Sequence, residues 1–254
     1  IRVWLLDSWA DFRYLFWPSP GRPNNLAILI SLGDVRGDLR AAHDGAIEAL
    51  SSPGTWWTGA QRNELARTAI MAFVEREPVA PWVGVSSVAG KLPAQLTAPK
   101  IAHDAIYRIV RHAATLTREW YDKVSAEIEP LAFIELCGIA CSVAAISAFR
   151  RALGLPSLEL APVKSGDPSR TKPENIVAAK LNWVPVVGPA DQEAAVVQAF
   201  TAVPDTNRVI WSMADAQYIP DKEMVDPNWT RGTLSRVQME LVATRVSQQR
   251  ECFY

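Results

Sequence analysis

The sequence predicts an all-α protein, and two observations carry that prediction. Within residues 101–125, apolar side chains recur on one helical face, namely Ala102, Ile106, Ile109, Ala113, Leu116 and Trp120. Residues 130–153 form the most apolar stretch, and Gly154 and Pro156 follow it, as they often do at the end of a helix. No stretch alternates apolar and polar residues for long enough to indicate a sheet.

The same periodicity predicts the remaining helices. They are expected at residues 35–50, from Glu64 to about residue 73, and at residues 194–200, 207–217 and 233–249. Prolines and glycines mark loops at residues 18–25 and 78–97. Residues 156–192 are also rich in proline and are predicted to be a linker between two halves of the chain.

Composition limits the class of protein. The chain has 254 residues, of which 49% are hydrophobic and 21% charged, so it can bury a sizeable core. Its net charge is −1 and it has no basic tract, so nucleic acid is not an expected partner. Residues 1–17 are apolar and aromatic but interrupted by charges, so they read neither as a membrane span nor as a signal peptide. They either cover another surface or form a leader.

The cysteines and histidines indicate the expected compartment and argue against a metal site. Three cysteines do not make a secreted disulfide framework, which favours a cytoplasmic protein with reduced thiols. Cys137 and Cys141 share one face of an apolar helix and are predicted to be core residues. His103 and His112 are nine positions apart, which is not the spacing of a helical metal pair, and His43 stands alone. Neither a metal nor another cofactor is therefore expected.

The last twenty residues hold the candidate site. Ser235 and Gln238 have the spacing of a capping box, which predicts a helix start. The apolar stripe of this helix consists of Leu234, Val237, Leu241, Val242 and Val246. Glu240 lies at the edge of the stripe, where a solvated flank residue is the alternative interpretation. Cys252 follows twelve positions later.

This arrangement resembles the AhpD-like superfamily of alkylhydroperoxidases and carboxymuconolactone decarboxylase-like proteins. The family pattern is a Glu, a Cys twelve positions later, a second Cys three further on and a His four beyond that. Glu240 and Cys252 match the first two positions, and the other two would fall after Tyr254. Arg250 stands where the family often has Asn. The resemblance implies an AhpD-like helical bundle and a homo-oligomer, a trimer or hexamer. It also implies a small peroxide substrate and a dithiol reductant protein.

The spacing of the two residues has a physical requirement. Twelve residues of straight helix would separate Glu240 from Cys252 by about 18 Å, which is too far for proton transfer. A turn near residues 248–251 would let Cys252 open a second helix that folds back on the first. A thiol at a helix N-terminus has its thiolate stabilised by backbone N–H groups.

The two halves of the chain are alike, which indicates an internal repeat. Trp57-Thr58-Gly59 precedes Glu64 much as Trp229-Thr230-Arg231-Gly232 precedes Glu240. Twelve positions after Glu64 lies Arg76, where a cysteine would be expected. The predicted organisation is an N-terminal segment (1–25), a first AhpD-like unit without the thiol (26–155), the linker (156–192) and a second unit cut short before the second Cys (193–254).

The leading functional hypothesis is a thiol-dependent peroxidase-type oxidoreductase. In that hypothesis Cys252 attacks the peroxide, Glu240 relays the proton, and the chain as given lacks the second Cys and the His. One alternative is a non-catalytic helical oligomer or interaction module, because one unit has no cysteine. Another is a decarboxylase-like lyase of the same superfamily, against which the three scattered histidines argue.

Overall fold

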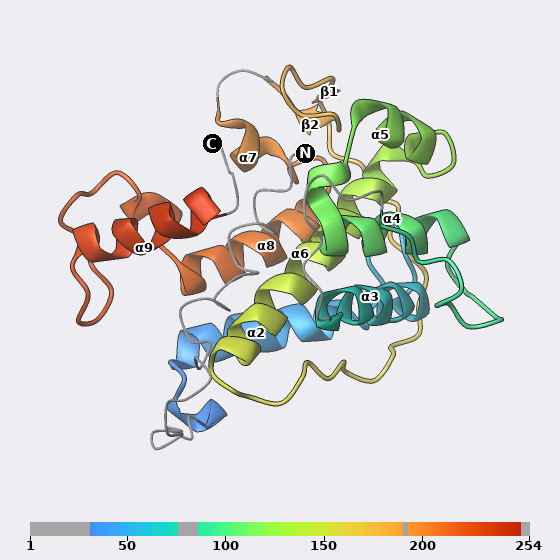
Figure 1. The fold of residues 1–254 in the computed structure, drawn as a ribbon. Helices are drawn as coiled ribbons and strands as arrows, with labels where there is room; N and C mark the ends of the chain where they lie inside the picture. Colours follow the sequence, from blue (N-terminus) through green and yellow to red (C-terminus); the bar gives the residue numbers. More distant parts are fainter. Residues whose placement is uncertain (1–30, 76–85, 190–192, 250–254) are drawn as a thin grey trace.

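The computed structural model describes residues 31–75, 86–189 and 193–249, and these are predominantly helical, as the sequence predicted (Figure 1). The α-helices of this part are α2 (Gly37–Ala49), α3 (Gly59–Val74), α4 (Lys100–His112), α5 (Arg118–Ser125), α6 (Pro130–Ala152), α7 (Ala195–Gln198), α8 (Pro204–Gln217) and α9 (Arg236–Gln249). Two short antiparallel strands, β1 (Ile176–Val177) and β2 (Val186–Val187), pair within the predicted linker. Single 3-10 turns, η2 (Leu32–Asp34), η3 (Ala113–Thr115) and η4 (Asp221–Glu223), complete the described elements.

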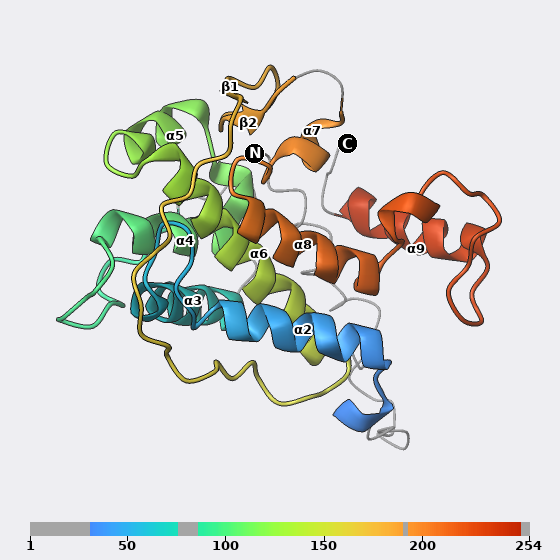
Figure 2. The same cartoon turned by 180° about the vertical axis from the view of Figure 1, so that it is seen from behind.

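Helix α6 is the centre of the fold (Figures 1 and 2). Pro130 occupies its first turn, where a missing N–H costs nothing, and every residue from Leu131 to Ala148 is buried. It packs against α2, α3, α4 and α8. By length and composition α6 could cross a membrane, yet 94% of its most apolar window is buried by the surrounding protein. Its apolar surface is therefore already covered within the fold.

Two predicted helix boundaries are corrected. The single helix expected over residues 101–125 is two helices, because α4 ends at His112 and α5 begins after Thr117. The Thr117 hydroxyl accepts a hydrogen bond from the Trp120 amide at 3.2 Å, so Thr117 caps a new helix. Helix α3 begins at Gly59 rather than Glu64, because Thr58 and Gln61 form a capping box.

Residues on both sides of the predicted linker share one hydrophobic core. Phe200, Val203, Ile210 and Met213 belong to the same buried cluster as the apolar residues of α3, α4 and α6. Helix α8 packs on both α2 and α6. The chain after residue 193 therefore contributes directly to the core around α6.

Residues 156–172, here called the strap, run as an extended segment from the end of α6 to the loop between α2 and α3 (Figure 1). The strap donates backbone hydrogen bonds from Lys164 to Ser51, from Ser169 to Gly54 and from Arg170 to Thr55, at 2.8, 3.0 and 2.9 Å. These bonds hold the loop that precedes α3 in one conformation.

Helix α9 lies at the edge of the molecule, away from α3 and α4 (Figures 1 and 2). Polar contacts hold the segment that leads into it. Arg231 pairs with Asp38 of α2 at 3.2 Å and donates to the backbone oxygens of Asp215 and Tyr218 at 2.6 and 3.2 Å. The apolar stripe faces solvent, with 76% of Val237 and 69% of Leu241 exposed. The described residues therefore anchor α9 by polar bonds and leave the stripe uncovered.

Candidate functional site

Helix α9 begins as the sequence predicted and carries Glu240 just past its first turn. The Ser235 amide donates to the Gln238 side chain at 2.9 Å, and the Gln238 amide donates to the Ser235 hydroxyl at 3.3 Å. This reciprocal pair is the predicted capping box. It fixes the helix start, and hence the direction from which Glu240 projects.

Both carboxylate oxygens of Glu240 have a donor. The Arg236 Nε donates to Oε1 at 2.7 Å, one helical turn away on α9. The Tyr218 hydroxyl, at the end of α8, donates to Oε2 at 2.8 Å. The Glu240 side chain is 43% exposed. Glu240 is therefore not merely a solvated flank residue, because two elements hold its carboxylate in place.

The two donors are themselves fixed. Arg236 is largely buried and also donates to the backbone oxygens of Met224, Asp226 and Glu223, at 2.8, 2.9 and 3.3 Å. Burial raises the pKa of Tyr218 to about 12, and its hydrogen bond to Glu240 acts in the same direction. Tyr218 therefore stays a neutral O–H donor at physiological pH.

The predicted nucleophile, Cys252, lies outside the described residues, and so do Arg250 and Glu251. Helix α9 remains helical through Gln249. The turn expected near residues 248–251 therefore does not begin at Gln248, because the helix continues past it. The distance between Glu240 and Cys252 stays a prediction.

Glu64, the counterpart of Glu240 in the proposed repeat, has different partners. Its Oε1 lies 2.7 Å from Nε2 of His103, whose Nδ1 lies 2.8 Å from the Thr68 hydroxyl. The Thr97 amide and hydroxyl both donate to Oε2. Burial alone would raise the pKa of Glu64, but the bonds from Thr97 and His103 outweigh it and lower that pKa. The spacing of nine residues from His112 led us to set His103 aside, although Glu64 and Thr68 share a helical face.

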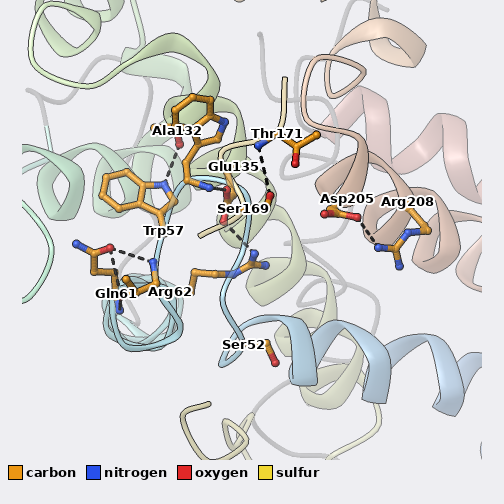
Figure 3. Close-up of polar contacts among 12 residues, drawn as sticks. Ser52, Trp57, Gln61, Arg62, Ala132, Glu135, Ser169, Thr171, Asp205 and Arg208 are labelled. Atoms are coloured by element: carbon orange, nitrogen blue, oxygen red, sulfur yellow. Dashed lines mark hydrogen bonds and ion pairs between the residues drawn. The ribbon is translucent and has the colours of Figure 1, made fainter. Parts of the chain in front are cut away.

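One carboxylate is fully buried: Glu135 of α6 forms an ion pair with Arg62 of α3 (Figure 3). The Arg62 guanidinium lies 2.9 Å from Oε1, and the Trp56 amide donates to Oε2 at 2.6 Å. Burial raises the pKa of Glu135, while the Arg62 charge opposes that rise. The adjoining cavity has a volume of about 10 Å³, room for one water molecule. This pair joins α3 to α6 and leaves no space for a substrate.

The other candidate residues are core residues. Cys137 and Cys141 are 0% and 2% exposed and form no disulfide, as predicted. Burial raises the pKa of Cys137 to about 12, so its thiol is unreactive at neutral pH. Within the described parts of the chain, no three His, Cys, Asp or Glu side chains are grouped as a metal site would require.

Comparison with known proteins adds no relative. No protein-family model matches the chain, and neither the curated proteins nor the solved structures contain a match.

Proposed function

We propose that the protein is a thiol-dependent, peroxidase-type oxidoreductase of the AhpD-like kind. Cys252 is the peroxide-attacking thiol and Glu240 is its proton relay. The observation that supports this proposal most is the fixed carboxylate of Glu240, which Arg236 and Tyr218 hold at 2.7 and 2.8 Å, twelve positions before Cys252. A relay requires a carboxylate in one defined position.

In the proposed step, the Cys252 thiol gives its proton to Glu240 and the thiolate attacks one peroxide oxygen. A sulfur–oxygen bond forms as the oxygen–oxygen bond breaks. The departing oxygen takes the proton from Glu240 and leaves as water or an alcohol. The sulfur becomes a sulfenic acid, two electrons more oxidised, and the peroxide is reduced by the same two electrons. A dithiol reductant then restores the thiol, becomes a disulfide and releases water.

The test follows a single turnover. The chain is mixed with hydrogen peroxide, and the rate of sulfenic acid formation is measured with a dimedone-type probe. Cys252→Ser should abolish the signal, and Glu240→Gln should lower the rate by roughly a hundredfold, the usual size of a general acid–base contribution. Glu127→Gln, an exposed carboxylate after α5, is the matched control. An unchanged rate in Glu240→Gln would refute the relay.

A second candidate function is self-association without catalysis, through the apolar stripe of α9. The observation that favours it is the exposure of Val237 and Leu241, at 76% and 69%. Apolar side chains side by side on a solvent-facing helix are typical of an interface. Sedimentation velocity over a range of concentrations should show an oligomer that Leu241→Lys disrupts. Leu181→Lys is the control, because Leu181 is 79% exposed and lies between β1 and β2 instead.

A further inference from the structure

We propose that Tyr218 and Arg236 are positioning residues for the Glu240 relay. This inference rests on the proposed function, because it assigns these two residues a role through Glu240. Both contacts are set by the described fold, since Tyr218 lies at the end of α8 and Arg236 in the first turn of α9. The relay is therefore built where two elements meet.

The backbone of Tyr218 is held by contacts other than the one to Glu240. Its amide donates to the Ala214 oxygen at 2.8 Å, and its own oxygen accepts from Arg231 at 3.2 Å. Arg231 in turn pairs with Asp38 of α2. The phenol of Tyr218 therefore has a fixed position relative to α8 and α2. Its hydrogen bond holds the Glu240 carboxylate in a defined position relative to these two helices.

Arg236 fixes the other oxygen in the same way. Its guanidinium makes four hydrogen bonds, one to Glu240 on one side and three to the backbone oxygens of Glu223, Met224 and Asp226 on the other. A guanidinium held in this way cannot rotate without losing several charge-assisted hydrogen bonds. It therefore supplies a fixed direction as well as a positive charge.

The two donors leave the Glu240 carboxylate able to accept a further proton. Each carboxylate oxygen has two lone-pair directions, and the structure gives each oxygen of Glu240 one donor, from Arg236 or from Tyr218. One direction on each oxygen remains for a proton from the thiol. Because the phenol keeps its own proton, it orients Glu240 without competing for the transferred one.

The experiment compares two reactions of Cys252 in the full chain. Reaction with hydrogen peroxide needs Glu240 to take the thiol proton and deliver it to the departing oxygen, whereas alkylation by iodoacetamide at pH 10, above the ordinary thiol pKa of about 8.5, needs only the thiolate that bulk base supplies. Tyr218→Phe and Arg236→Gln should each slow the peroxide reaction roughly tenfold to a hundredfold, as a misplaced catalytic group does, and leave alkylation within about twofold. Tyr121→Phe and Arg208→Gln are the controls, since neither residue contacts Glu240 in the structure.

A double variant separates positioning from general loosening. In a Glu240→Gln background, Tyr218→Phe should have no further effect on the peroxide rate, because Tyr218 acts through the Glu240 carboxylate and this variant lacks it. Equal slowing of both reactions by Tyr218→Phe would make the tyrosine merely structural and overturn the proposal. If Glu240→Gln slows the peroxide reaction while Tyr218→Phe and Arg236→Gln leave its rate unchanged, only the positioning role would be overturned. An unchanged peroxide rate in Glu240→Gln would overturn both the relay role of Glu240 and the positioning role of its two partners.

Discussion

The Nε2 atom of His103 lies 2.7 Å from the Oε1 of Glu64, the residue that the predicted repeat aligns with Glu240. His103 is fully buried, and its other nitrogen contacts Thr68. Twelve positions after Glu64, the chain has Arg76 in place of a cysteine. The Glu64–His103 pair therefore joins α3 to α4, and no thiol lies at the sequence position that corresponds to Cys252.

Glu64→Gln should lower stability in a pH-dependent way. The pKa of Glu64 is lower in the folded protein than its ordinary value of 4.5, so its stabilising effect is present above that pH and is lost as pH falls. We expect a loss of about 1 to 3 kcal/mol at pH 7, typical of hydrogen bonds to a charged group, and a smaller difference at pH 4. Urea denaturation at both pH values measures it. A difference that does not change with pH would contradict the assignment.

Gly54→Ala should break the buried ion pair. A Cβ at this position would lie within 3.0 Å of both Glu135 Oε1 and Arg62 Nη1. Separating a buried pair costs about 3 to 5 kcal/mol, so the melting temperature should fall by many degrees. Gly45→Ala in α2 is the control, because nothing lies within 4 Å of its Cβ. That variant should be neutral or stabilised by about 0.5 to 1 kcal/mol.

Thiol titration of the native chain should detect one of its three cysteines. Cys137 and Cys141 are buried in α6, and burial raises the pKa of Cys137 to about 12, so a disulfide reagent should reach neither. All three should react after unfolding in guanidinium. Cys252→Ser should remove the native signal. A second fast-reacting thiol in the native protein would show that α6 opens readily.

Arg231→Ala should loosen α9 without affecting α6. Arg231 joins the segment before α9 to Asp38 of α2 and to the end of α8. Hydrogen exchange followed by mass spectrometry should show faster exchange in residues 236–246 and unchanged protection in α6. Arg118→Ala, which removes an exposed ion pair with Asp122, is the control. Equal exchange in both variants would show that other contacts hold α9.

Local signals predicted most of the helices, because caps and periodicity are encoded within a few residues. Pro130 and Gly154 bracket α6, and Ser235 with Gln238 marks the start of α9. The break between α4 and α5 was missed because the apolar face continues through it, while Thr117 reads as a helix interior residue until its cap is seen. Periodicity reports which face is apolar and not where a helix stops.

Long-range partners were beyond sequence reasoning. Glu135 and Arg62 are 73 residues apart, and Tyr218 and Glu240 are 22 apart, so no local spacing connects them. One signal was available for the first pair. A charged residue inside the most apolar helix must find an opposite charge if it is buried, and Glu135 was such a residue. Only the folded structure shows that this partner is Arg62.

The strap has a consequence for the order of folding. Its hydrogen bonds join residues 164–170 to residues 51–55, more than a hundred positions earlier in the chain. Contacts between such distant segments carry a large loop-closure cost and form late. During synthesis, the loop that positions Trp56 over Glu135 therefore lacks its hydrogen bonds to the strap until residue 170 has left the ribosome. A nascent chain stalled between α6 and the strap should expose the tryptophans of that loop to quenchers, and release of the next twenty residues should shield them.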